Sequence, residues 1–338
     1  MSFLLDLLRK IFGFGKKTPA PKPDPKPAPP VNDPNEPANI TVNRVLAIIY
    51  NPTMDAEIGE KLADQAGWQR PADLMTGFSA DLQETSHGMV RNEIIERIEV
   101  DEFPVKADGF RYSPSQYLDV LHGITPQHEP HQVDYQAILG DFNIAERVEN
   151  NEIDEVWVFA FPYAGFYESV MAGKDAFWCN APPLEGTAHI SRRFLMMGFS
   201  YERGVGEMLE AFTHRIESIM KKTFAKTSGD ANLWKRYTRY DKKNPGQANL
   251  GNVHFAPNSL RDYDWGDPRF VSSNCDDWYN FPDFQGITRQ VNASEWGNGD
   301  IRLHHRWWMD HIPHVAGRIN GIHNNWWQYI MDPQKVEV

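Results

Sequence analysis

The chain has 338 residues, of which 41% are hydrophobic and 12% aromatic, and its formal net charge is −12. These values are typical of a folded protein and exclude an intrinsically disordered chain. The acidic balance argues against a nucleic-acid partner, because such binding needs a basic surface that displaces counterions from phosphates. With only two cysteines, the chain is neither a disulfide scaffold nor a CxxC zinc protein.

Residues 1–17 have the pattern of an amphipathic helix. Apolar side chains between Leu4 and Phe12 cover a wide face, and charged side chains share the narrow remaining sector. This pattern favours a helix lying in a membrane surface with its lysines near anionic headgroups. An atypical signal peptide and a helix that docks on a partner protein are alternatives. We therefore expect a peripheral location at a membrane or cell surface, without excluding the cytoplasmic side.

Residues 18–38 follow as a proline-rich segment, in which nine of the twenty residues from 18 to 37 are proline. Proline fixes φ and removes an amide donor, so the segment favours extended polyproline II over packed structure. We expect a disordered spacer between a surface anchor and the folded part. A tail without any anchoring role is the alternative.

Residues 39–227 alternate between strand-like and helix-like patterns. Apolar runs rich in β-branched or aromatic residues predict strands at 44–50, 93–100, 154–161 and 192–199. Helical patterns lie near 57–66, 71–85, 114–122, 135–149 and 200–222. The alternation predicts an α/β fold with a mostly parallel twisted sheet flanked by helices. Run 93–100 alternates most in polarity, so we place it at an edge.

Residues 228–338 form a loop-rich region that contains eight of the eleven tryptophans and six of the twelve histidines. We expect this Trp/His-rich region to pack on the α/β domain. Its tryptophans predict a core that buries their rings. A surface that stacks on sugar rings and a metal site built from histidines and carboxylates are the alternatives.

Ligands of open parallel sheets bind beyond the carboxyl ends of the strands. Polar side chains follow all four predicted strands, so a site can form on this rim. As general acid and base we select Glu168 and Glu202, with His254 reaching in from the C-terminal region. The residues expected to bind substrate are Tyr163, Arg203 and Asp101.

The helix predicted after the last strand carries Glu207, Glu210, His214 and Glu217 at helical spacing. Glu210 and His214 are the best-spaced ligands for a divalent metal, zinc or calcium. This stripe points away from the apolar face of the helix, which favours an ordinary solvated face. The metal interpretation depends on whether the C-terminal region packs over the stripe.

No family signature is complete in this chain. The G-x-S-x-G turn of α/β-hydrolases fails at Glu202, which leaves Ser200 as the expected N-cap of the following helix. Phosphate-binding glycine motifs do not occur after any predicted strand.

The preferred hypothesis is a surface-tethered hydrolase with a carboxylate-based site, acting on a glycan or another cell-envelope polymer. One alternative is a non-catalytic module that binds carbohydrate or protein. Another is an assembly protein that docks through its N-terminal helix.

Overall fold

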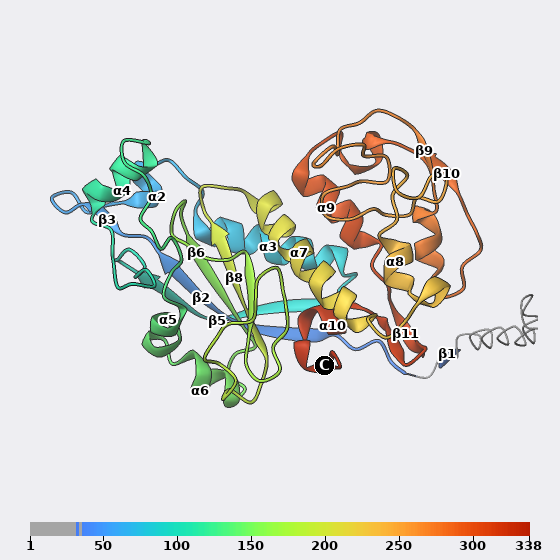
Figure 1. The fold of residues 1–338 in the computed structure, drawn as a ribbon, viewed down its shortest axis with the longest axis horizontal. Coiled ribbons are helices and arrows are strands. Elements are labelled where there is room, and N and C mark those ends of the chain that lie inside the picture. Colours follow the sequence, from blue (N-terminus) through green and yellow to red (C-terminus); the bar gives the residue numbers. More distant parts are fainter. Residues whose placement is uncertain (1–31, 34–35) are drawn as a thin grey trace, which may run out of the picture. The chain divides into compact units, whose positions relative to one another are not determined.

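A five-stranded sheet in the order β5-β2-β6-β8-β7 forms the centre of the fold (Figure 1). This is seen in a computed structural model that describes residues 32–33 and 36–338. The predictions for residues 1–17 and for most of 18–38 lie outside the described residues. The strands are β2 (Thr41–Tyr50), β5 (Val90–Val100), β6 (Glu155–Ala160), β7 (Ser169–Ala172) and β8 (Phe194–Ser200).

Four of these strands run parallel, and β7 pairs with β8 in the antiparallel direction. All six residues of β6 are buried, as are the last six of β2, which explains their continuous apolar sequences. The prediction of an α/β fold with a mostly parallel sheet is confirmed. Strand β5 lies at the edge, as its alternating sequence predicts.

Strand β7 was not predicted, because its four residues are too few to form a periodic pattern. The segment that leads into β7 passes very close to β8 at Gly198. A Cβ atom on Gly198 would lie 2.4 Å from the backbone oxygen of Tyr167. Glycine therefore lets the segment that precedes β7 pass directly against β8.

The helices agree with the sequence patterns in most places. The helices in this part are α3 (Pro71–Thr85), α4 (Pro114–Leu121), α5 (Tyr135–Asp141), α6 (Ile144–Glu149) and α7 (Val205–Thr223). The single helix expected over 135–149 is wrong, because Asn143 adopts a left-handed φ of 51° that separates α5 from α6. The helix expected over 57–66 is also wrong in part. A hairpin of β3 (Thr53–Asp55) and β4 (Glu60–Lys61) precedes the short α2 (Leu62–Gln65).

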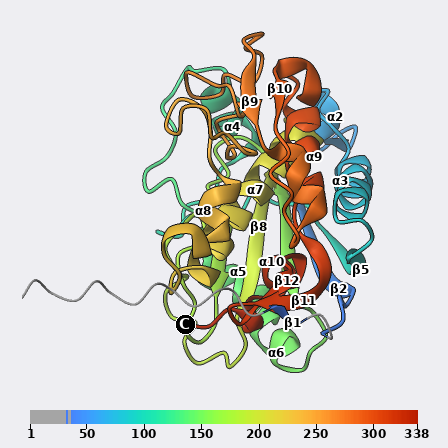
Figure 2. The same cartoon turned by 90° about the vertical axis from the view of Figure 1, so that its right-hand side faces the viewer.

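The C-terminal part contains short elements joined by long loops (Figure 2). These are α8 (Leu233–Tyr237), β9 (Val271–Ser273), β10 (Arg289–Val291), α9 (Ile301–Asp310), β11 (His314–Ile319), β12 (Ile322–Asn325) and α10 (Trp327–Met331). Helix α9 packs against α7 and α3, and α10 contacts α7 and β2. Seven of the eight tryptophans in this part are buried.

Strand β1 (Asn32–Asp33) lies within the segment for which composition predicts a spacer. It pairs with β11 in the antiparallel direction. Nearby, the Gly317 amide donates to the Glu36 backbone oxygen at 2.7 Å, and the Glu36 carboxylate lies 2.7 Å from His323 Nε2. Ordered contacts therefore begin before residue 39.

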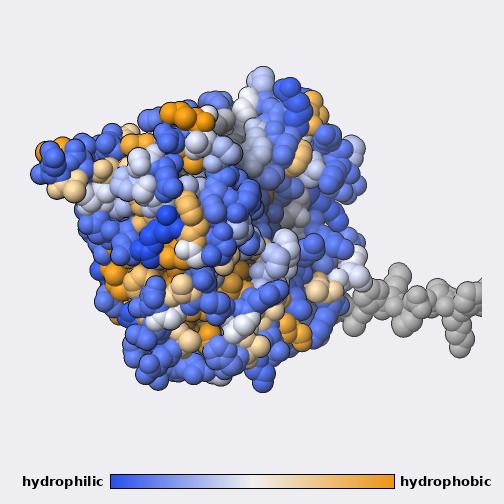
Figure 3. All heavy atoms as spheres, turned by 60° about the vertical axis from the view of Figure 1, so that its left-hand side comes forward, coloured by the Kyte–Doolittle hydropathy of each residue, from blue (hydrophilic) through white to orange (hydrophobic). Residues whose placement is uncertain are grey.

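The surface in view in Figure 3 is mostly hydrophilic, with hydrophobic patches between the polar side chains. Edge strand β5 exposes Ile94 and Ile95. Within the described part of the chain, each helix is too short or too polar to cross a bilayer.

Candidate functional site

A cavity of about 230 Å³ lies at the carboxyl ends of β6 and β8. Its walls come from the segment after β6, the end of β8 and the first turns of α7. Among the residues predicted for the rim, those that line it are Tyr163, Glu168, Glu202 and Arg203. The charged residues of the lining are four glutamates and one arginine, so the cavity is strongly acidic. Such a site favours neutral or cationic groups over anionic ones.

Asp101, which was also expected to bind substrate, has other partners. Its carboxylate accepts the Thr53 amide at 2.6 Å and lies 2.7 Å from Lys61 Nζ. It is not among the residues that line the cavity as the structure describes it. The β3–β4 hairpin supplies both partners, and that hairpin was not predicted.

The turn from β8 into α7 forms one wall of the cavity. Helix α7 begins at Val205, and Gly204 is its N-cap residue, so the prediction that Ser200 caps this helix is wrong. The Glu207 carboxylate accepts the Gly204 amide hydrogen at 3.1 Å, which satisfies a donor at the start of the helix. Ser200 instead lies in the cavity wall.

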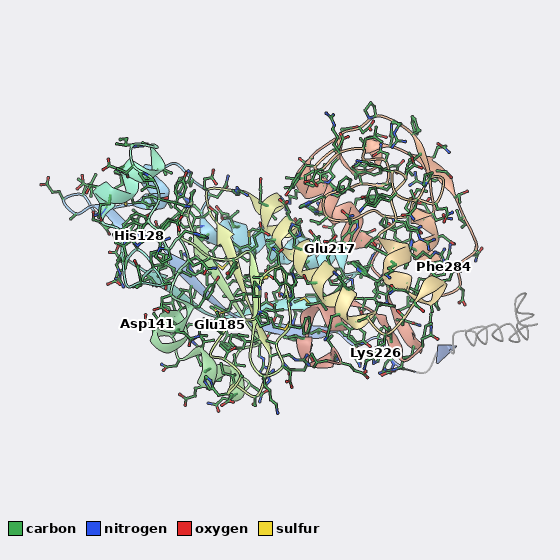
Figure 4. All side chains as sticks on the ribbon, in the orientation of Figure 1. His128, Asp141, Glu185, Glu217, Lys226 and Phe284 are labelled. Atoms are coloured by element: carbon green, nitrogen blue, oxygen red, sulfur yellow. The ribbon has the colours of Figure 1, made fainter. Side chains whose placement is uncertain are left out.

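The polar stripe of α7 is covered, so the expectation of a solvated face is wrong. Glu210 is buried, and His214 and Glu217 are partly buried. Glu217 lies on α7, where Figure 4 labels it. The loop at 251–254 comes up to this residue, and the Val253 amide donates to Glu217 Oε1 at 3.0 Å. The loop at 251–254 therefore packs over the stripe, which is the condition for the metal interpretation.

Glu210, His214 and His254 bring three ligand-type atoms together. The two Nε2 atoms of His214 and His254 are 3.2 Å apart, and His254 Nε2 lies 3.8 Å from Glu210 Oε1. One ligand atom from each residue lies within 4.8 Å of the other two. The arrangement can share a proton between the imidazoles or hold a cation.

The loop that presents His254 is a tight, hydrogen-bonded turn. Gly251 has a φ of +77°, and a Cβ atom there would lie 2.0 Å from the Phe255 backbone oxygen. The Asn252 side-chain oxygen accepts the His254 amide at 3.1 Å and the Phe255 amide at 3.0 Å. Glycine and asparagine thus fix the conformation that carries the imidazole to α7.

Two neighbours orient His254. Asp262 Oδ1 lies 3.1 Å from Nδ1, and the Tyr263 hydroxyl lies 3.0 Å from Nε2. A carboxylate on Nδ1 holds the proton there and leaves the Nε2 lone pair directed at His214. Tyr263 adopts a φ of 57°, which is uncommon for a residue with a side chain. Strained residues of this kind occur frequently at functional sites.

Burial controls the protonation of this group. It raises the pKa of Glu210 and lowers the pKa of His214. Partial burial and the hydrogen bond to Glu210 raise the pKa of Tyr263 to about 12, so its hydroxyl stays protonated near neutral pH. A neutral His214 keeps a lone pair for a proton or a metal.

Cys275, Asp276 and His311 form a second group with ligand-type atoms within 4.8 Å of one another. Arg289 Nε already binds Asp276 Oδ2 at 2.6 Å. Burial raises the pKa of the Cys275 thiol to about 11, which disfavours the thiolate that a metal needs. Both cysteines, Cys179 and Cys275, are unpaired thiols. The group of Glu210, His214 and His254 is therefore the better candidate for a metal site.

Comparison with protein-family models, with curated proteins and with solved structures finds no match for this chain. The assignment of a function therefore depends on the geometry of the site.

Proposed function

We propose that this chain is a hydrolase that cleaves a bond in an uncharged part of a glycan or another cell-envelope polymer. The observation that carries the proposal is the meeting of two histidines and a buried glutamate beside an acidic cavity at the carboxyl ends of parallel strands. Glu210 belongs both to this group and to the cavity lining. Reacting groups and a place for substrate therefore adjoin each other.

Glu168 is our candidate for the general base. It lines the cavity, and the Asn180 side-chain amide donates to its Oε2 at 2.7 Å, which fixes the carboxylate in place. A positioned carboxylate can take a proton from an attacking water molecule. Glu202, on another wall of the cavity, is the candidate for the acid that protonates the leaving group.

The group of Glu210, His214 and His254, together with Tyr263, can stabilise charge that develops during the reaction. The protonated Tyr263 hydroxyl can donate a hydrogen bond to charge that develops on the substrate. His254, oriented by Asp262, and His214 place their Nε2 atoms 3.2 Å apart, where the two imidazoles can accept a proton or a cation.

The acidic lining supports an uncharged substrate, because anionic groups would be repelled. Tyr163 and Arg203 are exposed on the cavity wall, where a polymer chain can contact them. The alternative of a carbohydrate-binding surface depended on exposed tryptophans. Seven of the eight tryptophans after residue 228 are buried, so that alternative loses its main support.

Turnover of neutral chromogenic esters, amides and glycosides tests the proposal. We expect Glu168→Gln to lower kcat by about 10²–10⁴-fold, the usual contribution of a general base. Glu185→Gln is the control, because this exposed glutamate lines a different surface depression. A wild-type protein without turnover on the whole panel, or a Glu168→Gln variant that keeps full activity, would contradict the proposed function.

A further inference from the structure

We propose that Glu210, His214 and His254 bind a zinc ion at the edge of the cavity. Binding itself does not depend on the hydrolase activity, although the catalytic use of the ion rests on the proposed function. The three residues come from two segments of the chain far apart in sequence, α7 and the loop at 251–254. Their approach therefore requires the tertiary fold and does not arise from helical spacing alone.

The distances between the ligand atoms fit a small tetrahedral ion. Zinc bonds of about 2.0–2.1 Å place neighbouring ligand atoms of a tetrahedron about 3.3–3.4 Å apart. The two imidazole Nε2 atoms are 3.2 Å apart, and the pair formed by His254 Nε2 and Glu210 Oε1 is 3.8 Å apart. The remaining pair, from His214 and Glu210, lies within 4.8 Å, so side-chain rotation has to bring these two residues closer around the ion.

The chemistry of the ligands selects zinc over calcium. Calcium and magnesium prefer six or more oxygen ligands, whereas two imidazoles and one carboxylate are a common zinc set. Calcium, one of the two metals that the sequence suggests, is therefore the poorer match to this group.

A second, independent observation is the carboxylate that lies beside the other ring nitrogen of His254. Metal-bound imidazoles usually donate their other ring N–H to a carboxylate or a carbonyl. Asp262 Oδ1 lies 3.1 Å from His254 Nδ1 and can accept that hydrogen, which keeps a lone pair on Nε2. An ion would take this lone pair in place of the Tyr263 hydroxyl, which lies 3.0 Å from Nε2. Glu217 holds the same loop from the other side through the Val253 amide.

A third observation is a buried polar layer behind Tyr263. The Tyr263 ring lies 5.3 Å from Trp265, and Trp265 stacks on His304 at 4.9 Å. Both ring nitrogens of His304 and His305, and the Trp265 indole nitrogen, are buried without a hydrogen-bond partner among the described residues. Proteins rarely leave such groups unpaired, which indicates that these nitrogens bind water or another polar group that is not part of the chain.

Three protein ligands leave one position of tetrahedral zinc for water or substrate. Because Glu210 also lines the cavity, an ion held by these residues would lie beside the proposed substrate. Zinc bound there would lower the pKa of its water molecule toward about 7 and polarise the bond to be cleaved. Glu168 would then accept the proton of that water molecule.

Calorimetric titration of the full chain with Zn²⁺, together with absorption spectra after loading with Co²⁺, tests this site. We expect one equivalent to bind, with the intense visible bands of tetrahedral cobalt. Asp262→Asn should weaken binding by about 10–100-fold, as expected for a residue that orients a ligand. His214→Gln, His254→Gln and Glu210→Gln should weaken it by more than about 100-fold. His128→Gln is the matched control, because His128 pairs with Asp108 at 2.8 Å away from α7 and should leave binding unchanged.

Circular dichroism checks that each variant is folded, and Glu210→Gln preserves the shape of the site if a histidine variant does not fold. Failure of the wild-type chain to bind Zn²⁺, or equal affinity in Glu210→Gln and wild type, would overturn the zinc site. Turnover that persists in zinc-free protein would overturn its catalytic use. Zinc binding without turnover on any substrate of the panel would instead overturn the proposed function and leave the zinc site standing.

Discussion

The covered position of Glu217 on α7 predicts how the free energy of unfolding depends on pH. Burial raises the pKa of this carboxyl from its ordinary value of 4.5 to about 7. Between these two pH values the folded protein keeps a proton that the unfolded chain has released. The stability that depends on this proton is therefore complete below about pH 4.5 and is lost as the pH rises to about 7. At about 1.4 kcal/mol per pH unit, the loss amounts to about 3 kcal/mol.

Glu217→Gln removes the charge and keeps an oxygen that can accept the Val253 amide. We expect the free energy of unfolding of this variant to exceed that of wild type by up to about 3 kcal/mol near pH 8 and to match it near pH 4.5. Urea unfolding at the two pH values measures both differences. Glu185→Gln, at an exposed glutamate, controls for the loss of one negative charge. An equal difference at both pH values would refute the conclusion that Glu217 is buried by the loop at 251–254.

Three further changes test other parts of the account. Gly251→Ala should lower the melting temperature through a loss of about 2 kcal/mol or more, because φ is +77° and Cβ would lie 2.0 Å from the Phe255 oxygen. Arg215→Met should lower the free energy of unfolding in urea by about 3–5 kcal/mol, since it removes the cation that lies 2.7 Å from the buried Glu155 carboxylate; an unchanged midpoint would contradict this. Deletion of residues 1–17 should abolish sedimentation with anionic liposomes, and unchanged sedimentation would exclude the tether.

The central sheet was predictable because four of its strands carry long, distinctive runs. Strand β6 has six consecutive buried residues, and an apolar run of that length between helical patterns is typical of a strand covered on both faces. Short elements gave no such signal. The four residues of β7 and the two of β4 are fixed by pairing with neighbours, and pairing leaves no periodic trace in so short a sequence.

The sequence indicates most residues of the candidate site but not how they come together. Helical spacing identifies Glu210 and His214, strand ends identify Glu168 and Glu202, and His254 is selected from the C-terminal region without a predicted contact to the helix. Spacing cannot show that a loop from residues 251–263 covers the stripe, because loop contacts across long sequence separations follow no period. Tyr263 was missed for this reason. Asp101 was selected for its place after a strand, yet an unforeseen hairpin supplies its partner Lys61.

Anomalous diffraction at the zinc edge, from crystals of the full chain grown with Zn²⁺, tests the central claim most directly. The proposed site predicts a single strong peak within about 2.0–2.1 Å of His214 Nε2, His254 Nε2 and a Glu210 oxygen, with its remaining position open to the cavity. A map without a peak between these three side chains, or with zinc only at other residues, would contradict the account.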